Sequence, residues 1–324
     1  MKRSIAPSAL LALGLGAAAA VFLYVTSDVS KILAALAVAG WGIVAVVFAH
    51  VPATAAATAG WRTVLPAGSP PLERLLLFRW IKEAVNSLLP VAQVGGDVVR
   101  TRLLIQRGVE PSAAIAGSVV DVAIGTASLF VYLLLGLGGL VLAPQKGVTG
   151  ALVLRAMAMA APLVLLAVAA PRLGLIRLID GAITRLGRRA AAAEGQDDTG
   201  LHDVIVGLYR RPWAVGSCLA WHLAAWGFGA AEAYVTLTIL DLQPSWTQAF
   251  LVDSLGQGFR AAGFLIPGAL GVQEGGFIVV FAMFGLPADQ ALAFSTLRRL
   301  REIILGLPGL FAWAGAEAAA RRVA

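Results

Sequence analysis

Long apolar segments separated by short polar connections make up most of this chain. Segments with the roughly 20 apolar residues that a bilayer span requires are readily located along the sequence. They lie at 8–27, 32–51, 113–142, 151–170, 214–240 and 290–316. The pattern predicts an all-α polytopic membrane protein with about six full spans.

Two further regions, 72–110 and 246–288, do not fit a simple span. Each is apolar in stripes but carries charged side chains, among them Asp97 in the first region and Arg260 and Glu274 in the second. Each region is either a transmembrane helix followed by a loop, or a hairpin that enters and leaves the membrane on the same face.

The distribution of Lys and Arg decides between these alternatives, because cytoplasmic loops carry an excess of basic residues. If both regions are re-entrant and the N-terminus is cytoplasmic, most of the 25 basic residues lie on the cytoplasmic side. If 72–95 crossed the membrane, the basic stretches 100–107 and 172–189 would face outward. We therefore predict two re-entrant helical hairpins, the first on the cytoplasmic side and the second on the outer side, with both termini cytoplasmic.

An internal repeat supports this topology. When the chain is shifted by 177 residues, Pro90 aligns with Pro267, Asp97 with Glu274 and Gly108 with Gly285. Repeats of opposite orientation, each broken near the midplane, are typical of transporters whose substrate site lies at the repeat interface. The expected fold is therefore an inverted repeat.

Composition is consistent with a single transmembrane domain over 1–324. Of the 324 residues, 59% are hydrophobic and 13% are charged, and the mean hydropathy is +0.84, whereas soluble domains carry about a quarter charged residues. We divide the domain into half one (1–187), a cytoplasmic loop (188–203) and half two (204–324). The net charge of +7 indicates topology rather than nucleic-acid binding, because the basic residues lie between apolar segments.

Proline and glycine interrupt both hairpins. Backbone polar groups left unpaired inside hydrocarbon cost several kcal/mol each, so the interruptions predict a protein-lined cleft. The predicted hairpin breakers are Pro90, Gly95, Gly96, Pro267, Gly268, Gly271, Gly275 and Gly276.

Charged residues beside these breaks form the predicted substrate-binding site. Asp97 and Glu274 are its carboxylates, and Arg298 and Arg301, one turn apart on the last span, are their expected partners. The site also includes Arg260, Asp121 and Asn86. A structural interpretation stays open: the carboxylates cap broken helices, and the arginines only balance charge.

Several other chemistries find no support in the sequence. The ATP-binding pattern GxxxxGK[ST] is absent, the three histidines lack metal-ligand spacing, and Cys218 is the single cysteine. We expect no cofactor, no metal and no enzymatic activity.

The stretches LLPVAQVGGDVVRTRLL, IPGALGVQEGG and LRRLRE resemble the flippase-like transmembrane domain of lysylphosphatidylglycerol synthases. That domain also occurs in stand-alone bacterial proteins, including hopanoid-associated ones. The synthases carry a soluble aminoacyl-transferase domain after the membrane part, and this chain has none before its last residue, Ala324, so lipid modification is not expected. The resemblance implies movement of a polar lipid between leaflets, with Asp97, Glu274, Arg298 and Arg301 at the matching positions.

The expected function is lipid translocation across the bacterial inner membrane, with the polar headgroup passing through a central charged cleft. The partner is then a membrane lipid, either a phospholipid or a hopanoid, and no nucleic acid. Two alternatives stay open: a proton-coupled secondary transporter of a small solute, and a non-transporting membrane partner of a lipid-modifying enzyme.

Overall fold

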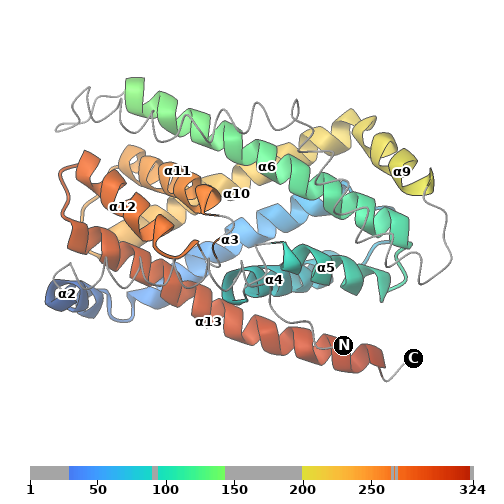
Figure 1. The fold of residues 1–324 in the computed structure, drawn as a ribbon, viewed down its shortest axis with the longest axis horizontal. Helices are drawn as coiled ribbons and strands as arrows, with labels where there is room; N and C mark the ends of the chain where they lie inside the picture. Colours follow the sequence, from blue (N-terminus) through green and yellow to red (C-terminus); the bar gives the residue numbers. More distant parts are fainter. Residues whose placement is uncertain (1–28, 90–93, 143–198, 264–265, 267–268, 322–324) are drawn as a thin grey trace.

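In the computed structural model, all regular structure in the described residues (29–89, 94–142, 199–263, 266 and 269–321) is helical (Figure 1). This confirms the all-α prediction for that part of the chain. The predicted spans 8–27 and 151–170 and the loop residues 188–198 lie outside it. In chain order the helices are α2 (Val29–Ala39), α3 (Gly42–Thr63), α4 (Leu72–Leu88), α5 (Gly95–Ile105), α6 (Pro111–Leu142), α9 (Thr199–Tyr209), α10 (Pro212–Ile239), α11 (Trp246–Ala262), α12 (Val272–Met283) and α13 (Ala288–Arg321).

Three long helices, α6, α10 and α13, coincide with the predicted segments 113–142, 214–240 and 290–316. By length and composition alone, α3 and the part of α6 from Pro111 to Leu140 are the helices in the described residues suited to crossing a membrane. Because α13 carries a cluster of charges in its middle, its composition does not fit a simple apolar span.

The predicted span 32–51 is wrong. Gly40 adopts a left-handed φ of 43°, and the apolar run divides there into α2 and α3. The second helix then continues to Thr63 through an alanine-rich segment and past Pro52. Hydropathy alone did not reveal this turn, because the residues on both sides of it are apolar. Residues 199–203 of the predicted cytoplasmic loop 188–203 belong to α9.

Helices α3 and α10 pack against each other in antiparallel orientation at the centre of the molecule (Figure 1). A Cβ atom at Gly42 would lie 2.6 Å from the side chain of Ile239, and one at Gly60 would lie 3.2 Å from the carbonyl oxygen of Cys218. Small residues let two helices approach closely where lipid provides no hydrophobic driving force. This contact joins half one to half two.

The regions 72–110 and 246–288 each fold back as a helical hairpin, α4 with α5 and α11 with α12. In the second hairpin, a Cβ at Gly276 would lie 2.3 Å from the ring of Phe259, and one at Gly256 would lie 2.4 Å from that of Phe277. In the first, a Cβ at Gly96 would lie 2.3 Å from the carbonyl oxygen of Lys82. Glycine is therefore required where the two helices of each hairpin touch.

This arrangement corrects the role predicted for several glycines. Gly95 and Gly96 begin α5, and Gly275 and Gly276 are the fourth and fifth residues of α12, so none of the four interrupts a helix. Gly271 does lie in the interruption and has a left-handed φ of 77°. The remaining predicted breakers, Pro90, Pro267 and Gly268, lie outside the described residues.

Helix boundaries agree with the internal repeat. The starts of α5 and α12 differ by 177 positions, as do those of α6 and α13. Gly108 lies between α5 and α6, and Gly285 lies between α12 and α13; their φ values are 83° and 71°. The turns share equivalent hydrogen bonds, for example from Val109 N to the Leu104 carbonyl and from Leu286 N to the Phe281 carbonyl.

The two hairpins lie toward opposite ends of the molecule, α11 and α12 at the left and α4 and α5 toward the right in Figure 1. Their orientation relative to a membrane stays a prediction.

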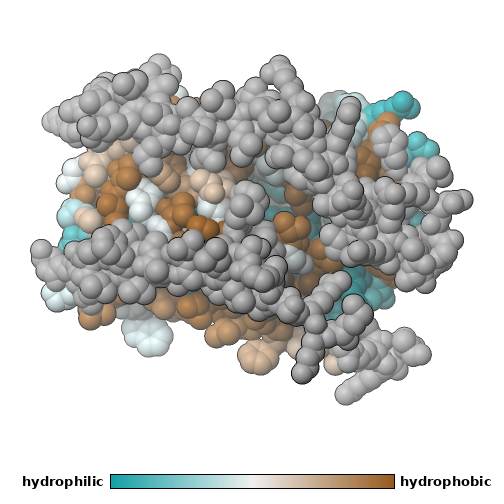
Figure 2. Space-filling view, viewed as in Figure 1, coloured by the Kyte–Doolittle hydropathy of each residue, from teal (hydrophilic) through white to brown (hydrophobic). Residues whose placement is uncertain are grey.

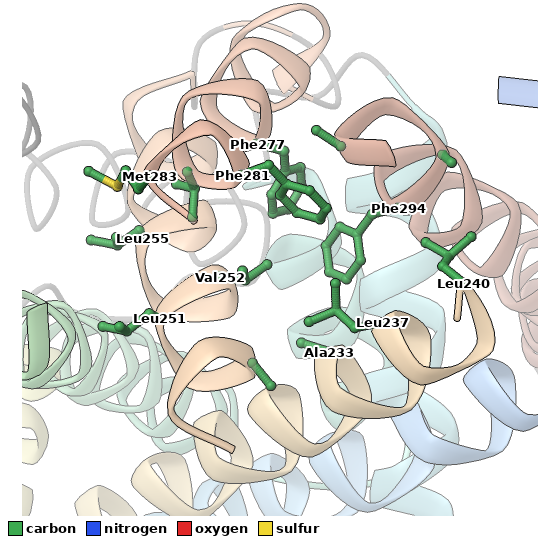
Figure 3. Packing of buried hydrophobic residues seen from close by; sticks show 14 of the residues in the cluster. Ala233, Leu237, Leu240, Leu251, Val252, Leu255, Phe277, Phe281, Met283 and Phe294 are labelled. Carbon is green, nitrogen blue, oxygen red and sulfur yellow. The ribbon is translucent and has the colours of Figure 1, made fainter. Parts of the chain in front are cut away.

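Each hairpin packs into its own hydrophobic cluster. Around the second hairpin, Phe277 and Phe281 of α12 meet Phe294 of α13 above Ala233 and Leu237 of α10 (Figure 3). The rings of Phe277 and Phe294 are edge to face, with centroids 5.0 Å apart. The other cluster surrounds α4 and α5. These clusters hold the hairpins firmly against the long helices.

Large hydrophobic side chains also point outward. On α3, Phe48 is 69% exposed, and on α13 Phe311 is 77% exposed, with Ile303, Ile304 and Leu307 on the same helix also exposed. Between the grey atoms in Figure 2, the visible surface is mainly hydrophobic across the middle of the molecule, while hydrophilic residues gather toward the right-hand end. An apolar outer surface around a charged interior is the reverse of a soluble protein.

Candidate functional site

Ion pairs link charged side chains of both halves into one network in the interior. Within the described residues, it contains seven acidic and seven basic side chains, with two histidines between them. The members are Arg79, Lys82, Glu83, Asp97, Arg100, Asp121, Glu232, Asp253, Arg260, Glu274, Arg298, Arg299, Arg301 and Glu302, together with His50 and His222.

Asp97 marks one end of this network, in the first turn of α5. Its Oδ1 lies 3.0 Å from Nζ of Lys82 on α4 and 2.8 Å from Nη2 of Arg100, one helical turn further along α5. The N-terminus of a helix also favours a carboxylate. Close to it, the side-chain oxygen of Asn86 accepts a hydrogen bond from the backbone N–H of Gly96 (2.8 Å), so the Asn86 amide closes the hairpin.

Arg100 connects Asp97 to Asp121 on α6. The guanidinium lies 2.7 Å from Oδ2 of Asp121, is fully buried, and stacks over the ring of Trp61 at 4.4 Å. Oδ1 of Asp121 lies 2.8 Å from Nε2 of His222 on α10. Nη1 of Arg79 on α4 lies 3.5 Å from Oδ2 of Asp121. His222, a residue of half two, is thus a partner of Asp121, a carboxylate of half one.

Glu274 occupies the position in α12 that Asp97 occupies in α5, the third residue of the helix. Its carboxylate accepts a hydrogen bond from the backbone N–H of Gly271 (2.7 Å) and lies 3.1 Å from the guanidinium of Arg299. Ser295 donates a further bond at 3.4 Å. Glu274 therefore both caps α12 and holds an arginine of α13, so the capping interpretation and the ion-pair interpretation both apply.

Glu232 of α10 receives the arginines that were expected at Glu274 and Asp97. Nη1 of Arg301 lies 2.7 Å and 2.8 Å from its two oxygens, and Nε of Arg298 lies 3.8 Å away. Arg298 is closer to Asp253 of α11, at 2.7 Å. The predicted pairing of Arg298 and Arg301 with Asp97 and Glu274 is therefore wrong.

Glu302 of α13 forms ion pairs with three arginines. It pairs with Arg260 of α11, with Arg299 at 3.3 Å and with Arg301 at 3.5 Å. Since Arg299 also binds Glu274, Glu302 connects the Glu232 pair to the hairpin carboxylate. Arg260, a predicted site residue, thus belongs to the network.

His50 of α3 joins the ion pairs around Asp121 to those around Glu232. Its Nε2 lies 3.8 Å from Glu83 of α4, which pairs with Arg79 at 3.1 Å, and its Nδ1 lies 2.8 Å from Glu232. A continuous path then connects the two hairpin carboxylates. It runs through Asp97, Arg100, Asp121, Arg79, Glu83, His50, Glu232, Arg301, Glu302, Arg299 and Glu274.

The network reaches the surface beside α3 and α4. The side chains of Glu83 and His50 are 33% and 24% exposed, as against 1% for Glu232 and Asp121. Thr54 donates a hydrogen bond to Glu83 at 2.9 Å. Together with Arg260, which is 24% exposed, Glu83 and His50 are the most exposed side chains of the network.

Several members were not predicted from the sequence as site residues. The basic residues Arg79, Lys82 and Arg100 were counted as cytoplasmic topology signals, but all three form ion pairs in the network, and Arg100 is fully buried. A sequence signal existed for Arg100, which stands three positions after Asp97 and therefore on the same helix face. No comparable signal pointed to His50, because its partners are 33 or more positions away.

Three potential metal ligands meet in this network: Asp121, Cys218 and His222 are buried with ligand atoms within 4.8 Å of one another. Arg100 and Arg79 already bring two positive charges to Asp121. Their repulsion opposes the binding of a cation there.

Comparison with known protein families identifies the family of this chain. The sequence model of the lysylphosphatidylglycerol synthase TM region matches residues 9–309. The chain belongs to this family. It is accordingly a membrane protein with transmembrane helices, and the outward-facing hydrophobic side chains of this family member are placed to contact lipid. No curated protein and no solved structure gives a significant match.

Proposed function

We propose that this member of the lysylphosphatidylglycerol synthase TM family moves a polar lipid between the leaflets of the bacterial inner membrane. The observation that carries the proposal is the continuous network of ion pairs from Asp97 to Glu274, enclosed by helices with an apolar outer surface. A lone charge at the bilayer centre costs roughly 2.5–3.5 kcal/mol. A large set of charged side chains inside a membrane protein therefore supports a functional role for them.

The balance of charge supports a headgroup that carries both signs, or a phosphate with a neutral polar group. With neutral histidines, seven acidic and seven basic side chains cancel. A headgroup enters such a network by replacing an existing partner: its phosphate takes the place of a carboxylate at an arginine, and its amine takes the place of an arginine at a carboxylate. Arginine suits this exchange because it binds phosphate and carboxylate alike in bidentate geometry.

The two hairpins supply the pathway in this proposal. They are re-entrant, the first from the cytoplasmic side and the second from the outer side, and both termini are cytoplasmic. The headgroup follows the ion pairs from one hairpin carboxylate to the other, while the hydrocarbon part of the lipid stays in the bilayer against the exposed face of α13.

Reconstitution tests the proposal. The full chain is inserted into vesicles, and the transbilayer movement of a fluorescent phospholipid is measured by quenching of the outer leaflet, with protein-free vesicles as the reference. We expect faster movement with the protein. Equal rates in the two preparations would contradict lipid translocation, and uptake of a water-soluble solute driven by a pH gradient would instead support a solute transporter.

A further inference from the structure

One ring nitrogen of His50 faces two partners that make opposite demands. Nδ1 lies 2.7 Å from Nη1 of Arg301, a donor, and 2.8 Å from Oε2 of Glu232, an acceptor. A nitrogen without a proton accepts from arginine, and a nitrogen with a proton donates to the carboxylate. The two contacts are therefore alternatives, and the position of one proton selects between them.

The other ring nitrogen adds a second carboxylate. Nε2 lies 3.8 Å from Glu83, so the ring stands between Glu83 of α4 and Glu232 of α10, with Arg301 of α13 beside it. A neutral ring carries one proton for two carboxylates, whereas an imidazolium carries one for each. These three groups are the charged side chains that face His50 from the helices packed against α3 in the described residues.

We propose that His50 is a proton-binding site that links the two halves of the protein. With the proton bound, the imidazolium joins Glu83 of half one to Glu232 of half two. Without it, Nδ1 accepts from Arg301 and the connection between the two carboxylates is lost. The inference goes beyond lipid movement, because it holds whatever the network carries.

The position of His50 suits this role. It is the ring through which the ion pairs of α4 reach those of α10 and α13, and its side chain is 24% exposed. His222 provides the contrast, since it is buried and faces Asp121 through Nε2.

Nitrogen NMR of the full chain in lipid nanodiscs, with ¹⁵N-labelled histidine, tests proton binding. The ring signals of His50 are assigned by their loss in His50→Gln. We expect them to change from a ring with one bare nitrogen to a doubly protonated ring as the pH is lowered over the range in which the chain stays folded. A ring that keeps one protonation state across this range would overturn the proposal.

Distance measurement between spin labels tests the link between the halves. Labels replace Leu72 on α4 and Phe311 on α13, both exposed, in a Cys218→Ser background. We expect the distance distribution to change with the same midpoint as the His50 signals. His50→Gln should abolish this change, while His202→Gln on α9 should retain it. A distribution independent of pH, or a change that survives in His50→Gln, would overturn the link. No lipid movement is measured, so the outcome is separate from that of the proposed function.

Discussion

Arg100 shows most clearly what burial of a charge means in this protein. It is fully buried between Asp97 and Asp121, and Trp61 covers its plane. Removing one member of a buried ion pair leaves an unpaired charge, which costs more than the pair itself contributes. Arg100 is therefore first a stabilising residue, whatever part it takes in transport.

We predict that Arg100→Met lowers the free energy of unfolding by about 3–5 kcal/mol, measured by reversible unfolding in detergent. Adding Asp121→Asn should recover part of this loss, because it removes the charge of one of the two carboxylates that lose Arg100. Arg102→Met is the control, since Arg102 is 64% exposed and pairs with Glu317 at the surface. An Arg100→Met protein as stable as the control would contradict the burial argument.

At the same scale, the sequence identified the carboxylates better than their partners. Asp97 and Glu274 stood out because they follow or precede glycines and align under the repeat, and both belong to the network. The arginine of Glu274 was missed because Arg298, Arg299 and Arg301 follow one another closely on α13. Only the rotation of α13 relative to α12 decides which of them faces Glu274, and that rotation depends on packing between distant segments.

The hairpin is the element that carries each end of the network. Its closure depends on glycine at the contact between the two helices, as at Gly96 and Gly276. The two regions that the repeat aligns each fold back as a pair of helices, α4 with α5 and α11 with α12, while their re-entrant placement in a membrane stays a prediction. The exact role of each glycine did not follow from the sequence, since a glycine that breaks a helix and one that lets a neighbour approach look alike.

We predict that Gly96→Ala destabilises the protein by about 1–3 kcal/mol, the usual cost of overpacking. Its Cβ would lie 2.3 Å from the backbone carbonyl oxygen of Lys82, which cannot move without the helix. Gly138→Ala in α6 is the matched control, because no atom lies within 4 Å of its Cβ. The free energy of unfolding in detergent is compared for the two variants. Equal values would contradict the prediction and show that α4 and α5 can move apart without loss of stability.

For the whole molecule, the repeat predicts opposite orientation of the halves in the membrane. The turns that end α5 and α12 share their backbone hydrogen bonds and their left-handed glycines, and Figure 1 shows the hairpins toward opposite ends. Hydropathy could not establish this alone, because the hairpin segments are too charged to be assigned as spans.

We predict that cysteines placed beside these turns, at Arg107 and at Pro287, react with a membrane-impermeant reagent from opposite sides. Both residues are exposed, and the Cys218→Ser background removes the single native cysteine. Labelling of intact cells and of inverted vesicles gives the side for each position. Reaction of both positions from the same side would refute the inverted arrangement.

The central claim is that lipid headgroups cross through the ion pairs between Asp97 and Glu274, and lipid movement in charge-neutralised variants tests it most directly. Asp97→Asn and Glu274→Gln are compared with wild type in reconstituted vesicles, after unfolding measurements show that each is folded. Glu317→Gln, a carboxylate on α13 outside the network, is the control. We predict that both network variants lose the protein-dependent movement of the fluorescent phospholipid and that the control keeps it. Wild-type rates in Asp97→Asn and Glu274→Gln would contradict the account.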